Sequence, residues 1–456
     1  MVPRETGTTP ATMEAYFQEL ASALDGMVHA GETGIAWLAA ESTDFVRMSR
    51  GKVRQPGSVI QRYLDVGLVS GARQATRQLS LSGDLSADRA RLAAAVGLLR
   101  STLPDLADDP HLLIATVPQS SRAVRGGPLP DAEEIVATVL GDAEGLDLVG
   151  LYAGGPVYRG FTNTLGQRNW HEATTFDLQW SLYHRADKAV KSGLSGFTWD
   201  AAAFAAKMAG ARAQLADIAR PSKALAPGKY RVFLAPSAFE DVASMLCWGG
   251  FSARALATKQ SSLTRMRGDD GADGLVLDPI VTMTEATADG VAPGFQAEGF
   301  ARPARVPLIQ AGRLVGALTS PRTAREFAQD ANGANGHEGP ESLAMAAGTL
   351  AAADALAALD TGIYAGNLHY LNYSDRPAGR MTGMTRFATF WVEHGRIVAP
   401  IDVLRFDDTI FRMLGANLEA LTVETELLLS SDTYHERALA SMRLPGVLLS
   451  EMTFTL

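Results

Sequence analysis

The sequence has 456 residues, of which 46% are hydrophobic and 20% charged, and its formal net charge is −9 at pH 7. This length exceeds the ~100–200 residues that one hydrophobic core usually organises, so we expect two domains, with room for a third, small lobe. The acidic balance and the scattered basic residues argue against nucleic acid as a direct partner, because duplex binding needs clustered Lys and Arg. The single cysteine, Cys247, excludes an internal disulfide framework and a cysteine-based zinc cluster.

Signals for export or membrane insertion are missing from the sequence. No segment approaches the ~18 apolar residues that cross a bilayer. The first residues, MVPRETGTTPATMEAYF, contain no apolar run suited to a signal peptide. We therefore expect a cytoplasmic globular protein that makes no contact with a membrane.

The first part of the chain mixes helical and strand patterns. Apolar positions at helical spacing predict a helix from about Met13 to Val28, and Ile35–Leu81 indicates short strands joined by turns, one of them at Gln55-Pro56-Gly57. Ser86 is the expected cap of a further helix. Another helix is predicted from Asp131 to about Asp142.

The clearest strand signal is the alternation of apolar and polar residues over Thr174–Tyr183, which predicts one buried and one wet face. Asp200 is then expected to cap a helix with Phe204 and Met208 on its apolar stripe. The stretch Arg220–Gly228 is rich in Pro and small residues, and we place the domain boundary there.

The second part is richer in strand signals. A strand at residues 232–234 precedes a helix near Phe239–Leu246, and glycine-containing hairpins are expected at Leu308–Val315 and Phe387–Ile401. Gln329–Gly339 is predicted to be a polar loop. We therefore expect an α+β protein, with an N-terminal α/β domain over residues 1–220 and a strand-rich, barrel-like C-terminal domain over residues 221–456.

The usual catalytic motifs are incomplete. Gly155–Thr162 has the glycine spacing of a phosphate loop, but Phe161 stands where the lysine is required. Ser195 lacks the second glycine of a nucleophile elbow. Cys247 ends an apolar helix, where a buried structural thiol is the expected role.

The histidines show no metal-binding spacing. His171-Glu172 and His337-Glu338 begin like a zinc-peptidase helix, but no second His follows at the required distance. His184 is expected in the core or at its rim, and His394 at a hairpin tip. His369 could contribute to a site, but no partner for it is visible in the sequence.

Several weak motifs occur in an order that resembles the TldD/PmbA family, once labelled modulators of DNA gyrase. Gly294–Phe300 and the hairpin after it resemble the family's F-D-x-E-G element, and Asp360–Tyr364 resembles its D-G-x-Y strand. Phe390–Ile401 resembles the closing hairpin, and Phe161–Gly166 an N-S-x-G turn. The resemblance implies an N-terminal α/β domain, a barrel-like β domain, and dimers that enclose a cavity for unfolded peptide.

The same resemblance bears on the metal site. TldD-type subunits carry HExxxH on the helix after the first C-terminal strand, and a cysteine ligand near the C-terminus. In this sequence the matching helix runs over Val242–Ser252, and Cys247, Trp248 and Ser252 stand where His, Glu and His would be. The chain is therefore similar to the TldE/PmbA-type subunits, which lack the motif, and we expect no metal ligands or catalytic residues at these vacated positions.

The expected function is a non-catalytic subunit of a zinc metallopeptidase that cleaves unfolded or modified peptides. No cofactor is expected in this chain; zinc belongs to a TldD-type partner in a heterodimer. The strand Thr174–Tyr183 and the loop Ala331–Gly339 are candidate peptide-binding edges, and His369, His337 and Glu298 are candidate contacts for a peptide or a metal. Two alternatives remain: an active hydrolase with a relocated metal site that uses His369, His337 or Cys247, and a homodimeric peptide-binding adaptor without catalysis.

Overall fold

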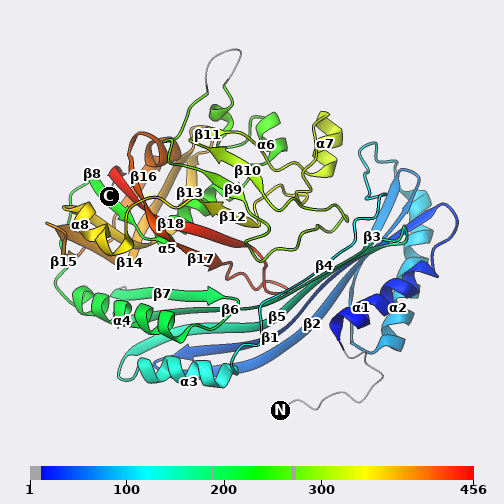
Figure 1. Cartoon of the computed structure of the whole chain (residues 1–456), viewed down its shortest axis with the longest axis horizontal. Helices are drawn as coiled ribbons and strands as arrows, with labels where there is room; N and C mark the ends of the chain where they lie inside the picture. The colour runs from blue at the N-terminus through cyan, green and yellow to red at the C-terminus, as the bar shows by residue number, and fades with distance from the viewer. Residues whose placement is uncertain (1–11, 187, 269–273, 456) are drawn as a thin grey trace.

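The computed structural model describes residues 12–186, 188–268 and 274–455 (Figure 1). Residues 1–11, which carry part of the expectation about a signal peptide, lie outside these ranges. Helices and strands mix through the first half and strands prevail in the second, so the predicted α+β class is confirmed. Within the described ranges, no helix combines the length and the apolar character needed to cross a membrane.

The first half of the chain builds a long, curved sheet along one side of the molecule (Figure 1). Its strands pair in the order β3-β2-β1-β5-β6-β4, and β7 pairs with the same edge of β6 as β4 does. Among the described strands of this sheet, only β4 runs parallel to its neighbour. The strands are β1 (Glu32–Ser49), β2 (Lys52–Ser70), β3 (Arg73–Ser80), β4 (Ser121–Arg125), β5 (Asp147–Asn163), β6 (Arg168–Arg185) and β7 (Lys188–Gly196).

The expectation of short strands over Ile35–Leu81 is wrong, because β1 and β2 have 18 and 19 residues. Pro56 does not form a turn but lies inside β2, opposite Val46. A proline is tolerated there because β3 pairs only with Tyr63–Ser70, so no described strand needs an N–H from the outer edge of β2 around Pro56.

Four helices pack against this sheet and bury its apolar side chains in two clusters. Asp200 caps its helix as predicted, with Oδ1 accepting from the N–H of Ala203 at 2.9 Å. The helix predicted to start at Ser86 is instead capped by Asp84, which lies in extended conformation just before the first helical residue. The helices are α1 (Met13–Asp25), α2 (Leu85–Thr102), α3 (Ala132–Asp142) and α4 (Ala201–Ile218).

The strand β6 contains the predicted Thr174–Tyr183 segment, and only half of the prediction for its faces is right. Phe176 and Trp180 are buried as expected. The other face is covered rather than wet, with Thr175 2% and Asp177 8% exposed. Arg437, in the connection between the last two strands of the chain, donates to Oγ1 of Thr175 at 2.8 Å, so the second half of the chain packs onto this face.

The second half builds an 11-stranded sheet that closes on itself. The last strand, β18, pairs with β8, which completes a ring with β13, β14 and β16 and agrees with the barrel-like expectation. The predicted domain boundary between residues 220 and 221 falls in the connection before β8 and remains a prediction. The strands are β8 (Gly228–Leu234), β9 (Met283–Glu285), β10 (Val306–Gln310), β11 (Arg313–Leu314), β12 (Ser342–Met345), β13 (Gly362–Asp375), β14 (Arg380–Glu393), β15 (Arg396–Pro400), β16 (Arg405–Thr409), β17 (Leu418–Leu429) and β18 (Ser441–Phe454).

Both predicted hairpins are confirmed. Their turns place Ala311-Gly312 and His394-Gly395 at positive φ, the backbone conformation that tight two-residue hairpin turns require. The helix predicted near Phe239–Leu246 is also present. The helices of this half are α5 (Pro236–Cys247), α6 (Ala253–Ala257), α7 (Pro321–Phe327) and α8 (Ala355–Leu359).

Candidate functional site

The segment aligned with a zinc motif is not one helix, contrary to the expectation for Val242–Ser252. The helix α5 ends at Cys247, and Gly249 turns the chain with a φ of +76°. At Gly250 a Cβ would lie 2.3 Å from the carbonyl oxygen of Leu246, so only glycine lets the chain fold back this closely. Ser252 then begins the next helix, so the three aligned positions do not share one helical face.

The side chains at the end of α5 are poor zinc ligands. Burial, with the nearby charge of Glu285, raises the pKa of the Cys247 thiol to about 12. The thiol therefore stays protonated at neutral pH, whereas a metal binds the thiolate. Trp248 is 58% exposed, and the guanidinium of Arg376 lies 4.5 Å from its ring centroid.

The hydroxyl of Ser252 is already used in hydrogen bonds that hold the local structure. Its hydroxyl caps α6 by accepting from the N–H of Ala255 at 3.0 Å, and it donates to Oε2 of Glu338 at 2.6 Å. Glu338 is 2% exposed and also accepts from the N–H groups of Arg254 and Ser320, at 2.9 and 2.8 Å. Burial acts to raise the pKa of Glu338, but these hydrogen bonds outweigh it and hold the pKa below its usual value.

A buried ion cluster lies close to this region. Arg302 joins Glu285 at 2.5 Å and also pairs with Glu341. The side chains of Arg302 and Glu285 are 6% and 2% exposed. Burial raises the pKa of Glu285, and the charge of Arg302 and the N–H groups of Ser342 and Glu341 act against that rise.

The three candidate contact residues lie on different parts of the fold. His337 and Glu298 are exposed loop residues, and Glu298 accepts from the side chain of Gln296 at 2.6 Å. His369 lies on β13, where burial and then the charges of Arg386 and Lys191 lower its pKa. Among the described residues no three His, Cys, Asp or Glu side chains are grouped so that they could hold a metal ion.

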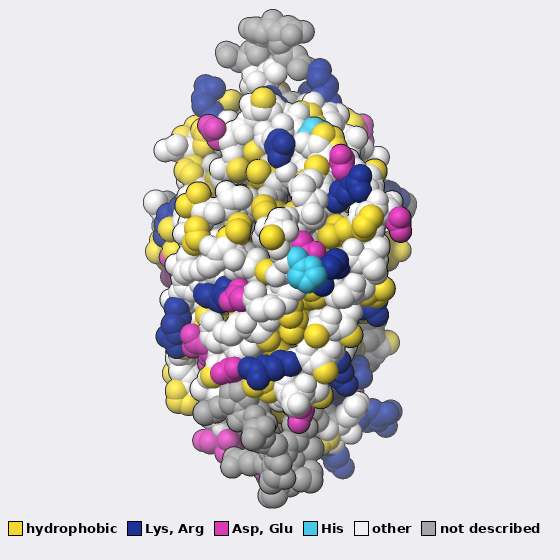
Figure 2. Space-filling model, turned by 90° about the vertical axis from the view of Figure 1, so that its right-hand side faces the viewer, with side chains coloured by type: hydrophobic (Ala, Val, Ile, Leu, Met, Phe, Trp, Pro, Cys, Tyr) yellow, Lys and Arg dark blue, Asp and Glu magenta, His cyan; other side chains and the backbone are white. Residues whose placement is uncertain are grey.

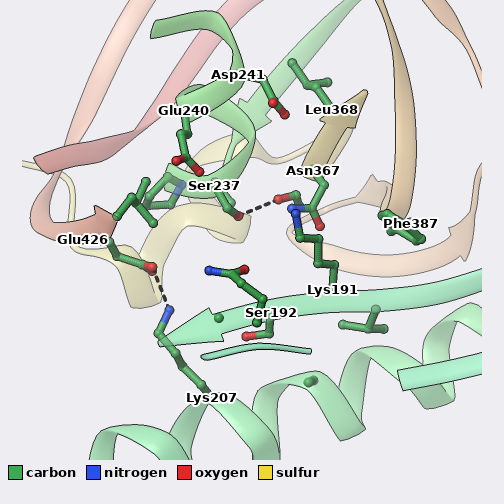
Figure 3. Close-up of a pocket in the computed structure, with 18 of the residues that line it drawn as sticks. Lys191, Ser192, Lys207, Ser237, Glu240, Asp241, Asn367, Leu368, Phe387 and Glu426 are labelled. Atoms are coloured by element: carbon green, nitrogen blue, oxygen red, sulfur yellow. Dashed lines mark hydrogen bonds and ion pairs between the residues drawn. The ribbon is translucent and has the colours of Figure 1, made fainter. Parts of the chain in front are cut away.

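His369 does line a cavity of about 470 Å³ between the two sheets. Figure 3 shows α5 and β13 on one side of this cavity and β7 and α4 on the other, with β17 closing one end. The volume falls in the ~300–1,000 Å³ range of small-molecule sites. Sequence reasoning missed the cavity because its walls combine segments as far apart in the chain as β7, β13 and β17.

The cavity contains several charged groups. Glu240 and Asp241 face it from the first turns of α5, and Lys191 faces it from β7 (Figure 3). Burial raises the pKa of Glu240 to about 7, with a further contribution from Asp241, and burial raises the pKa of Asp241 to about 6. Oε2 of Glu426 forms an ion pair with Nζ of Lys207 at 2.7 Å. Of the residues that line this cavity, sequence reasoning identified His369 and missed the adjacent acids Glu240 and Asp241.

Of the two predicted peptide-binding edges, the strand needs correction and the loop remains a prediction. The segment Thr174–Tyr183 is an interior strand, since β6 pairs with β5 on one side and with β7 or β4 on the other. The loop Ala331–Gly339 is irregular as predicted, but its Glu338 is buried under α6 and α7. Among the described strands β7 pairs only with β6, so β7 is a sheet edge that sequence reasoning missed.

The surface charges are of mixed sign. On the face shown in Figure 2, Lys and Arg are interspersed with Asp and Glu and form no continuous basic patch. A duplex-binding surface needs such a patch to displace counterions from phosphates. This face therefore gives no support to nucleic acid as a direct partner.

The order of the motifs indicates a family for this chain, and the match to a family model decides the question. Residues 227–456, just over half of the chain, match the model of the PmbA/TldA metallopeptidase C-terminal domain. The chain belongs to the TldD/PmbA family. No curated protein matches the chain in sequence.

Solved structures share the fold of this TldD/PmbA protein at low identity. TldE from Thermococcus kodakarensis has a TM-score of 0.76 at 12% identity over 96% of this chain and 100% of its own. A protein from Thermotoga maritima, named as a modulator of a DNA gyrase, has a TM-score of 0.71 at 13% identity over 97% of this chain and 100% of its own. A protein from Bacteroides thetaiotaomicron, named as a modulator of DNA gyrase, has a TM-score of 0.72 at 15% identity over 98% of this chain and 100% of its own. At these identities the likeness establishes the fold.

The residues at the aligned positions do not fit a TldD-type zinc site. Catalytic zinc takes imidazole, carboxylate or thiolate ligands and keeps an open position for water. The chain offers a protonated thiol at Cys247, an indole at Trp248 and a hydroxyl at Ser252 that is bound to Glu338. None of the three matches the ligand or base that the motif requires at its position.

Proposed function

We propose that this chain is the non-catalytic, TldE/PmbA-like subunit of a TldD-type zinc metallopeptidase that cleaves unfolded or modified peptides. In this proposal zinc and the general base belong to the partner subunit. The present chain completes the peptide-binding surface of the pair. Family membership supports the link to metallopeptidases, and the donor set at the aligned positions supports the division of roles.

The single observation that carries the proposal is the set of hydrogen bonds that Ser252 makes. In a helix that continued past Cys247, position 252 would lie one turn beyond position 248, on the same side. Instead Ser252 caps α6 and binds Glu338, which also holds the start of α7. The fold uses this segment to join α6 and α7, which fits a structural role.

The peptide-binding part of the proposal rests on β7. An edge strand offers unpaired backbone N–H and C=O groups to an extended peptide, which can add to the sheet as a further strand. The edge of β7 borders the cavity, next to β17, where Ser195 donates to the carbonyl of Leu427 at 2.9 Å. A peptide on this edge would have its side chains at the cavity.

Mixing the chain with a TldD-type subunit is expected to give one stable complex with the mass of the pair. Size-exclusion chromatography with light scattering measures this directly, and each protein run alone is the control. Two separate peaks at their individual masses would contradict the pairing. A stable self-dimer that binds peptide but ignores the TldD-type subunit would replace the proposal with a homodimeric adaptor.

A further inference from the structure

The cavity between α5, β13 and β7 holds hydrogen-bond acceptors that have no donor. The carboxylate of Glu426 is paired with Lys207, but within the described part of the chain the side chain of Glu240 makes no hydrogen bond or ion pair. Asp241 receives one backbone hydrogen bond, from Leu368. Two carboxyl groups on consecutive residues therefore line the cavity with few hydrogen-bond donors near them.

A third acceptor comes from β13, on the same side of the cavity as α5. Asn367 is 6% exposed, and its Oδ1 has no hydrogen-bond partner among the described residues. Figure 3 shows its side chain pointing from β13 toward Lys191 on β7. A buried amide oxygen without a donor is energetically unfavourable, so a ligand that supplies a donor here would be stabilised.

We propose that this cavity binds a primary ammonium group carried by a peptide, with Glu240, Asp241 and Asn367 as its acceptors. An ammonium presents three N–H donors and one positive charge, which match two carboxyl groups and an amide oxygen. A divalent metal ion fits less well, because calcium and magnesium take about six or more oxygen ligands. The identification of the carrier as a peptide rests on the proposed function.

The rest of the cavity suits such a carrier. Its volume of about 470 Å³ greatly exceeds that of one ammonium group. Leu194 and Leu428 form an apolar part of the cavity wall. The edge of β7 offers backbone groups with which a peptide can form hydrogen bonds. A short peptide can therefore place its ammonium at α5 while its backbone lies along β7.

Burial makes the free site electrostatically unfavourable. It raises the pKa of Glu240 to about 7 and that of Asp241 to about 6, so ionising both acids is costly without a cation. Lys191 is the nearby cation, and its charge acts against both shifts, although it makes no ion pair with either acid. An incoming ammonium would compete with Lys191 for these acids.

Three probe peptides test the proposal by calorimetric titration of the full chain. They are penta-alanine amide with a free amino terminus, its acetylated form, and the acetylated form with a central lysine. We expect at least one amine-bearing probe to bind about tenfold more tightly than the plain acetylated peptide. Binding of the first alone would assign the amino terminus as the source, and binding of the third alone the lysine side chain. Equal binding of all three, or binding by none at millimolar concentration, would overturn the proposal.

Matched variants locate the site. Glu240→Gln with Asp241→Asn is expected to weaken the favoured probe about tenfold or more, whereas Lys191→Met is expected to tighten it several-fold by removing the competing cation. Glu133→Gln with Glu134→Gln makes the same charge change on the exposed face of α3 and should leave binding unchanged. Thermal unfolding of each variant checks that it is folded. Unchanged binding in the folded Glu240 and Asp241 variant would refute the assignment.

The two proposals can fail separately. A chain that pairs with a TldD-type subunit but does not discriminate among the probes would leave the subunit role and remove the ammonium site. A chain that binds the amine probes through Glu240 and Asp241 but pairs with no TldD-type subunit would keep the site and remove the subunit role.

Discussion

Replacing Arg302 with Met is expected to lower the free energy of unfolding by about 3–5 kcal/mol at about pH 8. The side chains of Arg302 and Glu285 are 6% and 2% exposed, so the change leaves a carboxylate buried without its cation. Removing one partner of such a pair costs more than the pair itself contributes, because the remaining charge keeps its desolvation penalty. Urea-induced unfolding followed by circular dichroism measures the effect.

The loss of stability in Arg302→Met should depend on pH. Burial already raises the pKa of Glu285, and without Arg302 the pKa rises further. A carboxyl whose folded pKa is raised carries no penalty below its unfolded pKa and an increasing one as the pH rises toward the folded pKa. The variant should therefore lose less stability at about pH 5 than at about pH 8.

Arg305→Met is the matched control for this prediction. Arg305 is 59% exposed and pairs with the 42% exposed Asp289. Exposed ion pairs contribute about 0–1 kcal/mol, so this change should alter stability little at either pH. Equal losses in the two variants would show that the Arg302 cluster is not a buried pair of the kind described.

Replacing Glu338 with Ala is expected to cost about 3 kcal/mol, because it leaves three donors at the starts of α6 and α7 without their acceptor. These donors are the hydroxyl of Ser252 and the N–H groups of Arg254 and Ser320. Glu338→Gln keeps one accepting oxygen and should lose less. The same unfolding experiment measures both changes.

The matched control here is Glu326→Ala, which removes an exposed glutamate on α7 and should change stability by less than about 0.5 kcal/mol. If Glu338→Ala lowered the free energy of unfolding no more than this control, the hydrogen bonds of Ser252 would not have the structural role that the proposed function requires. The prediction therefore also tests the central observation of that proposal.

Elements with a local signature could be predicted from the sequence. The hairpin turns at Ala311-Gly312 and His394-Gly395 and the cap at Asp200 depend on a few neighbouring residues, and the structure confirms them. Pro56 misled the prediction because a proline breaks a strand only where its N–H is needed, and no strand in the described ranges pairs with the outer edge of β2 there. That fact depends on the pairing of distant strands, which the local sequence does not show.

The candidate site was harder to predict for the same reason. Glu240 and Asp241 are adjacent in the sequence, but the groups that face them, Lys191 and Asn367, are about 50 and 125 residues away. Likewise Cys247 and Ser252 looked like positions on one helix, and only the turn at Gly249-Gly250 separates them. The family resemblance came from the order of motifs along the chain, which needs no knowledge of distant contacts.

The zinc content of the chain purified alone, measured by elemental mass spectrometry after dialysis, tests the central claim most directly. We predict a negligible amount of zinc in the isolated chain, and about one zinc ion per pair, with peptidase activity, once a TldD-type subunit is added. About one zinc ion retained per isolated chain, together with peptidase activity, would contradict the account and make this protein an enzyme with a metal site of its own.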